Sequence, residues 1–95
     1  KNGVGDCFTY FAVSKALLDR AEIPNVDLTR LGGTTKHYWS LIDCGEGWYH
    51  FDSCPNKDKK NGFYLTESDV EKLTEIRGRN YYVYDKTLID VTVVE

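Results

Sequence analysis

The sequence of 95 residues contains no methionine, two prolines and three cysteines. Three cysteines are too few for a disulfide scaffold, and because the number is odd, at most one disulfide can form within the chain. No apolar run approaches the roughly 18 residues that a membrane span needs, and no signal-peptide pattern is present. Because methionine is absent and the chain starts at Lys1, we expect an excised piece of a longer protein, with any targeting segment upstream.

The chain also lacks a strong charge of either sign. Its 12 basic and 15 acidic residues give a net charge of −3, and the basic ones are scattered, which argues against a nucleic-acid footprint. Hydrophobic residues make up 41% of the chain and aromatic residues 14%, which argues against disorder. This composition predicts one folded domain over residues 1–95, with aromatic side chains in its core and in any cleft.

The first part of the chain predicts a helix over residues 6–21. Asp6 is a suitable N-cap, so Cys7 becomes the first helical residue, and apolar positions follow at spacings of three and four. The helix is expected to end before Pro24, because the residue preceding a proline is disfavoured in helical conformation. Residues 25–35 are mostly polar and are interpreted as a connector.

Two runs, 37–43 and 48–52, flank a glycine-containing turn and predict a β-hairpin. A tight turn at Gly45-Glu46 would pair Leu41 with His50. In that register His37 and Asp52 lie on one face of the hairpin, one diagonal step apart and within contact distance. Residues 53–62 predict a solvated loop.

The rest of the chain predicts one further short helix and two strands. Thr66 and Asp69 form a capping-box pattern at the start of the helix, and Gly78 is expected to end it. The runs 81–84 and 88–94 are rich in aromatic and β-branched residues and are predicted as strands. The order of elements indicates an α+β domain with an antiparallel sheet.

Cys7 is the strongest candidate for a chemically active residue. At the first turn of a helix, free backbone N–H groups and the helix dipole stabilise a thiolate, so we expect the pKa of Cys7 below that of a free thiol. Gly3 and Gly5 just upstream leave room for a substrate. The alternative is a buried cysteine that packs as a small hydrophobe.

A thiolate nucleophile needs a base, and imidazole is suited to that role near neutral pH. His37 is the candidate base, and Asp52 is the carboxylate that would orient it. Alternatively, His37 is a strand-end histidine bonded to a neighbouring acid. His50 competes for the role of base but lies in mid-strand, so we interpret it as a structural or cleft-wall residue.

A metal site is the other arrangement to consider. Cys44 and Cys54 are ten residues apart, whereas structural zinc sites usually contain close ligand pairs, so neither zinc nor another cofactor is expected. A disulfide between Cys44 and Cys54 is also disfavoured, because the hairpin register puts them on opposite faces.

These motifs together resemble the transglutaminase-like superfamily in its bacterial form. The resemblance is close over residues 3–55 and looser from Phe63 to Lys86. It rests on Gly5-Asp6-Cys7-Phe8-Thr9-Tyr10, Ala21-Glu22-Ile23-Pro24, His37-Tyr38-Trp39 and Gly47-Trp48-Tyr49-His50-Phe51-Asp52, with Pro55 after them. The thirty residues from Cys7 to His37 and the fifteen from His37 to Asp52 make this ordered set specific.

The resemblance implies a papain-like α+β core, in which the helix carrying the cysteine packs on an antiparallel sheet. It implies Cys7 as nucleophile, His37 as general base and acid, and Asp52 as orienting carboxylate. The implied activity is cleavage or transfer of peptide amide acyl groups through a thioester, as in a cysteine peptidase, amidase or acyltransferase. The family's domain begins further upstream, so elements that complete its oxyanion site are expected before Lys1.

By the same resemblance we expect a monomer that is secreted or attached to the cell surface and acts on protein or peptide amides. The alternative is a non-catalytic domain of this fold, which serves binding or structure in a larger surface protein. The presence of Cys7, His37 and Asp52 together favours the enzyme.

Overall fold

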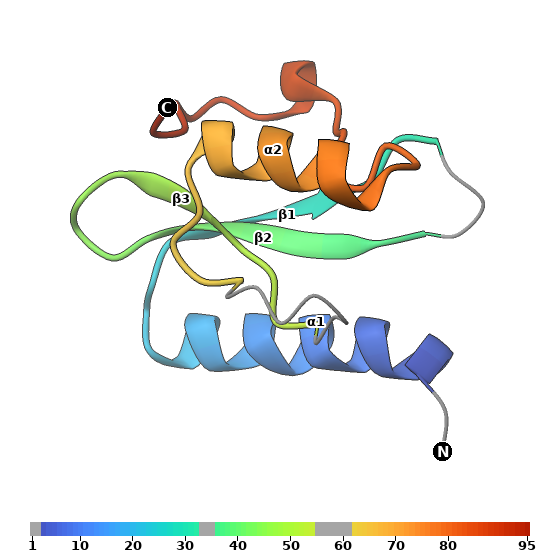
Figure 1. Cartoon of the computed structure of the whole chain (residues 1–95). Helices are drawn as coiled ribbons and strands as arrows, with labels where there is room; N and C mark the ends of the chain where they lie inside the picture. The colour runs from blue at the N-terminus through green and yellow to red at the C-terminus, as the bar shows by residue number, and fades with distance from the viewer. Residues whose placement is uncertain (1–2, 33–35, 55–61) are drawn as a thin grey trace.

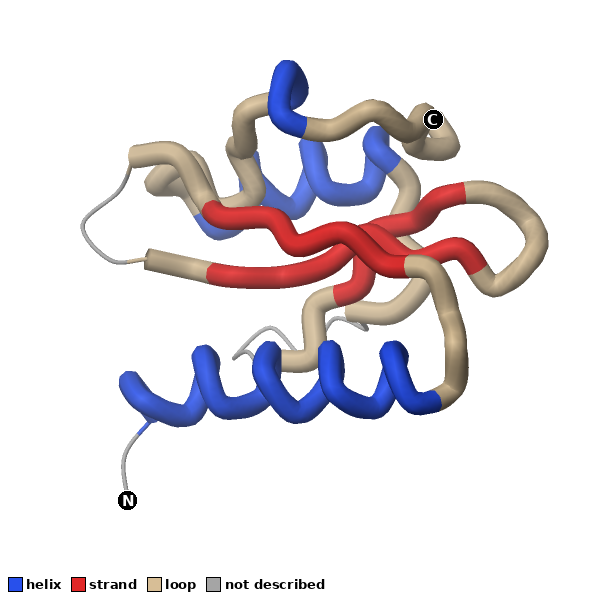
Figure 2. Tube along the Cα trace, turned by 180° about the vertical axis from the view of Figure 1, so that it is seen from behind, coloured by secondary structure: helices blue, strands red, loops and turns tan. Residues whose placement is uncertain are grey.

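The computed structural model describes residues 3–32, 36–54 and 62–95, and for residues 3–9 it describes the backbone alone. A three-stranded antiparallel sheet in the order β1-β2-β3 forms the middle layer. Helix α1 lies on one face of this sheet, and α2 lies on the other with the C-terminal segment (Figure 1; from behind, Figure 2). The elements are α1 (Gly3–Arg20), β1 (Asn25–Thr29), β2 (Tyr38–Asp43), β3 (Trp48–Phe51), α2 (Glu67–Arg77) and a 3-10 helix, η1 (Lys86–Leu88).

Helix α1 begins at Gly3, three residues before the predicted start at Asp6. Cys7 is therefore the fifth residue of the helix and not the first. An α-helix leaves the N–H groups of its N-cap and first three residues without intrahelical acceptors, and in α1 the last of these is Gly5. The expectation that Cys7 opens the helix is corrected, and its own N–H is no longer among those free groups.

The hairpin of β2 and β3 has the predicted register. Leu41 pairs with His50 and Asp43 with Trp48, and the strand bounds agree with the predicted runs to within a residue. At the turn, the Asp43 carboxylate accepts a hydrogen bond from the Gly45 N–H at 2.8 Å. The side chain of the last strand residue thus stabilises the turn that sets the pairing.

The prediction of a polar connector over residues 25–35 is wrong for its first part, which forms β1. This strand pairs antiparallel with β2 along its whole length. Val26 pairs with Leu41, and Leu28 pairs with Trp39. Two alternating apolar residues are therefore enough to form a strand when the neighbouring strand supplies the packing surface. Residues 33–35 of the predicted connector, and 55–61 of the predicted loop, lie outside the described residues.

Helix α2 begins and ends where the sequence predicts. Thr66 accepts a hydrogen bond from the Asp69 N–H, and the Asp69 carboxylate accepts one from the Thr66 N–H, so the capping box is complete. Gly78 follows the helix with a positive φ of 73°, and its N–H donates to the Thr74 carbonyl.

The strands predicted over 81–84 and 88–94 are absent from the described chain. Arg79 and Asn80 adopt positive φ and form a turn, and the segment then runs on the same side of the sheet as α2 (Figure 1). An isolated bridge joins Val93 to Trp48 of β3, and the Val83 carbonyl accepts a hydrogen bond from the Leu31 N–H just beyond β1. The β-branched and aromatic side chains here serve packing onto the sheet, which overrides their strand propensity.

The core lies between the sheet and α2. Its buried members come from the strands, α2 and the C-terminal segment: Leu28, Trp39, Leu41, Val70, Leu73, Tyr82, Tyr84 and Val93. By contrast, none of the side chains described in α1, residues 10–20, is fully buried. No described helix is long and apolar enough to cross a bilayer.

Candidate functional site

His37 and Asp52 form a buried pair where the two hairpin strands end. His37 directly precedes β2 and Asp52 directly follows β3, and the Nε2 and Oδ2 atoms are 2.8 Å apart. Their exposed fractions are only 4% and 6%. The contact that the hairpin register predicts is therefore present.

The pairing assigns different roles to the two nitrogens of the His37 ring. A carboxylate can only accept a hydrogen bond, so Nε2 carries the proton that it donates to Asp52. Nδ1 is then the ring nitrogen that has a lone pair and can accept a proton from another group. This is the arrangement that an oriented general base requires.

The Asp52 carboxylate is fixed by three hydrogen bonds. Besides the bond from His37, Oδ2 accepts one from the Tyr82 hydroxyl at 2.7 Å, and Oδ1 accepts one from the Cys54 N–H at 3.0 Å. The Tyr82 hydroxyl in turn accepts a bond from Arg77 Nη1 at 2.7 Å. These contacts hold the acceptor of His37 in one orientation.

Aromatic rings surround the His37 imidazole. The centroids of Tyr81, Trp39 and Tyr82 lie 4.9, 5.7 and 5.9 Å from that of His37. Burial, and secondarily the charge of Asp52, raise the pKa of Tyr82 far above its ordinary value, so its hydroxyl stays neutral and remains a donor. The pair is thus buried among aromatic rings, where its hydrogen bonds are little weakened by water.

His50 is bonded at both ring nitrogens and is fully buried. Nδ1 lies 3.0 Å from the Trp39 indole nitrogen and Nε2 lies 2.9 Å from Glu67 Oε1. An indole N–H can only donate, so Nδ1 of His50 accepts and Nε2 donates to Glu67. The lone pair that a base needs is already engaged, which supports the interpretation of His50 as structural.

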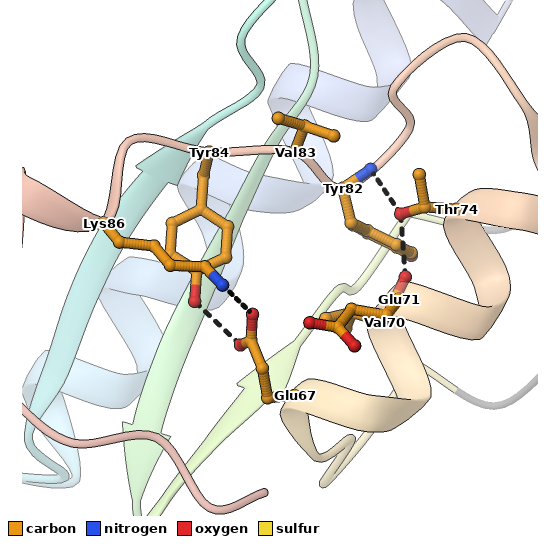
Figure 3. A pocket seen from close by; sticks show the side chains of 8 residues that line it. All are labelled: Glu67, Val70, Glu71, Thr74, Tyr82, Val83, Tyr84 and Lys86. Atoms are coloured by element: carbon orange, nitrogen blue, oxygen red, sulfur yellow. Dashed lines mark hydrogen bonds and ion pairs between the residues drawn. The ribbon is translucent and has the colours of Figure 1, made fainter.

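Glu67 is the centre of this second polar cluster, on the α2 side of the sheet. Its carboxylate also accepts a bond from the Tyr84 hydroxyl at 2.8 Å and pairs with the Lys86 ammonium at 3.0 Å (Figure 3). The bond from His50, followed by those from Tyr84 and Lys86, lowers the pKa of Glu67 to about 2 against the opposing effect of burial. The cluster borders a cavity of about 220 Å³ that is also lined by Tyr82 and Val70.

Sequence reasoning did not identify Tyr82, Arg77 or Glu67. All three belong to α2 or follow it, and they reach the hairpin only because the chain folds α2 and the next segment over the sheet. The abundance of tyrosine predicted aromatic groups in the core, but no spacing in the sequence indicated which of them would bond to a carboxylate.

The three cysteines differ in exposure, in disulfide bonding and in whether their side chains are described. Cys44 is a free and exposed thiol, whereas Cys54 is buried and disulfide-bonded, so the two are not joined to each other. The partner of Cys54 is not among the described side chains. The side chain of Cys7 likewise lies outside the described part of the chain, so its role stays a prediction.

Searches of family models, curated proteins and solved structures gave no match to this chain. Within the described residues, no group of three or more histidine, cysteine or acidic side chains could hold a metal ion. What the described site can do chemically is orient an imidazole and receive a proton at Nδ1 of His37.

Proposed function

We propose that the chain is a cysteine-dependent acyl-transfer domain of the transglutaminase-like type, with Cys7 as nucleophile, His37 as base and acid, and Asp52 as orienting carboxylate. The observation that carries the proposal is the buried bond between His37 Nε2 and Asp52 Oδ2, which leaves Nδ1 as the basic nitrogen. This pair, which both the hairpin register and the family resemblance predict, supports the proposal because the chemistry requires an oriented imidazole.

In the proposed reaction, His37 Nδ1 takes the proton of the Cys7 thiol, and the thiolate attacks the carbonyl carbon of an amide. The imidazolium then gives this proton to the departing amine as the C–N bond breaks, which leaves a thioester on Cys7. Water or a second amine attacks the thioester after losing a proton to His37, and the released thiolate regains one. Asp52 stabilises the imidazolium in both halves of the reaction.

The same proposal includes a papain-like core, peptide or protein amides as substrates, a monomeric state and a location outside the cell or on its surface. Within this proposal we favour a peptidase or amidase over a cross-linking enzyme, because nothing in the pattern of residues 1–95 indicates a calcium site. These points rest on the family resemblance of the motifs.

A second candidate function is a non-catalytic binding or structural domain. It is favoured by the position of Cys7 as the fifth residue of α1, where the helix terminus offers less stabilisation to a thiolate. It would keep the His37–Asp52 bond as a structural contact and would need no reactive thiol.

Turnover of a peptide amide library by the full chain tests the proposal. Because Cys54 is disulfide-bonded, the assay contains a reductant that keeps every thiol free. We expect Cys7→Ser and His37→Ala to remove turnover and Asp52→Asn to lower it by about 10²-fold or more, whereas Cys44→Ser keeps it. No turnover by the reduced protein would favour the binding domain, whereas equal rates for wild type and Cys7→Ser would show that Cys7 is not the nucleophile.

A further inference from the structure

We infer that Tyr82, held by Arg77, is a positioning residue that fixes Asp52 and, through it, the orientation of the His37 imidazole. The inference rests on the proposed function for its kinetic consequence. Its geometric part concerns the described side chains alone: Arg77 Nη1 to Tyr82 at 2.7 Å, Tyr82 to Asp52 at 2.7 Å, and Asp52 to His37 at 2.8 Å.

The direction of each hydrogen bond in this chain is fixed by the chemistry of its ends. A guanidinium can only donate and a carboxylate can only accept, so the Tyr82 hydroxyl accepts from Arg77 and donates to Asp52. His37 Nε2 donates to the same oxygen from the other side. The hydroxyl therefore cannot rotate away without losing two charge-assisted bonds.

The Tyr82 ring is restricted by packing, as its hydroxyl is by hydrogen bonds. The ring meets Trp39 edge-on, with centroids 5.0 Å apart and an interplanar angle of 75°, and the side chain is buried. The Arg77 guanidinium carbon lies 5.3 Å from the centroid of the Tyr82 ring. A rigid donor on Oδ2 keeps the carboxylate from turning about its own bond, and the imidazole follows the carboxylate.

Other groups near His37 make different contacts in the described part of the chain. The Tyr81 ring contacts the imidazole. The guanidinium carbons of Arg30 and Arg77 lie 5.1 and 4.7 Å from the centroid of the Tyr81 ring. The backbone of Cys54 bonds to the other oxygen, Oδ1, and reaches it from within the same loop. Tyr82 is the side chain that connects α2, through Arg77, to the oxygen that His37 uses.

Tyr82→Phe removes this donor and keeps the ring. Tyr84→Phe is the matched control. Tyr84 is also a buried tyrosine on this side of the sheet, and its hydroxyl donates to the buried carboxylate of Glu67. Both variants and the wild type are compared as full chains under reducing conditions, at a temperature where denaturation curves show each to be folded.

Two readouts separate positioning from stability. Side-chain ¹⁵N NMR reports which His37 nitrogen carries the proton, and amide turnover reports kcat and KM. We expect Tyr82→Phe to reduce the Nε2–H population of His37 and to lower kcat by about 10-fold with KM changed less than about twofold. Tyr84→Phe should leave both as in the wild type. Arg77→Lys should retain more of kcat than Arg77→Met.

The outcomes distinguish this inference from the proposed function. If Tyr82→Phe matches Tyr84→Phe in the His37 NMR signals and in kcat, the positioning role is overturned whatever the wild type catalyses. If the wild type shows no turnover but Tyr82→Phe alone disturbs His37, the proposed function fails while the coupling of Tyr82 to His37 is supported.

Discussion

At the residue scale, the two histidines show how hydrogen-bond partners divide chemical roles between identical side chains. His37 is bonded to a carboxylate through one nitrogen, whereas His50 is bonded through both, to a donor and to an acceptor. The sequence could predict the contact of His37 with Asp52, because strand parity places them on one face. It could not predict the partners Tyr82 and Glu67, since these come from segments that fold over the hairpin.

The two histidines should respond differently to mutation. His50→Ala leaves the Trp39 indole N–H and the Glu67 carboxylate without their buried partner, so we expect the free energy of unfolding to fall by roughly 3 kcal/mol. Under conditions where it is folded, this variant should keep amide turnover, whereas His37→Ala should remove it. Urea denaturation and initial rates measure the two effects, and loss of turnover confined to His50→Ala would reverse the assignment of the base.

Glu67 should make the protein sensitive to acid. Its pKa is lowered from 4.5 to about 2, so the stabilisation that it contributes is complete above pH 4.5 and is lost as the pH falls toward 2. By linkage, about 2 kcal/mol of the free energy of unfolding should be lost from this group by pH 3. Denaturation curves at pH 6 and pH 3 should show a smaller loss for Glu67→Gln than for the wild type.

The exposed neighbour Glu71 supplies the control for that experiment. Glu71→Gln should lose stability between pH 6 and pH 3 as the wild type does. An equal loss for Glu67→Gln would show that the Glu67 carboxylate does not stabilise the fold through its charge.

At the element scale, the parts that the sequence predicted well are those with local signals. The hairpin has its glycine turn and α2 has its capping box and terminal glycine, and each of these acts within a few residues. The failures are β1 and the C-terminal segment, where the outcome depends on a distant surface. Val26 and Leu28 become strand residues because β2 lies beside them, and Tyr82 and Tyr84 pack on the sheet because its α2 face is open to them.

The hairpin turn should tolerate alanine unequally at its two glycines. Gly45 and Gly47 both have positive φ, 112° and 114°, so alanine at either position strains the backbone. A Cβ at Gly47 would also lie 2.9 Å from a methyl group of Val94, whereas none of the described atoms comes within 4 Å of one at Gly45. We expect Gly47→Ala to lower the free energy of unfolding by about 1 kcal/mol more than Gly45→Ala in urea denaturation. Equal losses would mean that Val94 moves aside freely.

At the scale of the whole molecule, the two helices contribute unequally to the fold. Val70 and Leu73 of α2 belong to the buried core, whereas the described side chains of α1 stay partly or fully exposed, as for Leu17 and Val13. Local opening needs less free energy where less apolar surface is buried. Over residues 10–20, α1 is therefore less firmly held than α2.

Amide hydrogen exchange should reveal this difference. Amides in residues 10–20 of α1 should exchange faster than those of β2 and the buried turns of α2, by about tenfold or more at neutral pH. The NMR exchange rates of the wild type are sufficient for this comparison. Equal protection in α1 and β2 would mean that the three layers unfold only as one unit.

The central claim is that Cys7 is a thiol nucleophile activated by the His37–Asp52 pair. The most direct measurement is the rate of iodoacetamide alkylation of each cysteine in the reduced, native full chain, followed against pH by peptide mass spectrometry. We predict that Cys7 reacts faster than the exposed thiol of Cys44 near neutral pH, and that His37→Ala removes this advantage. If Cys44 or Cys54 is alkylated first, or if His37→Ala leaves the rate at Cys7 unchanged, the account is contradicted.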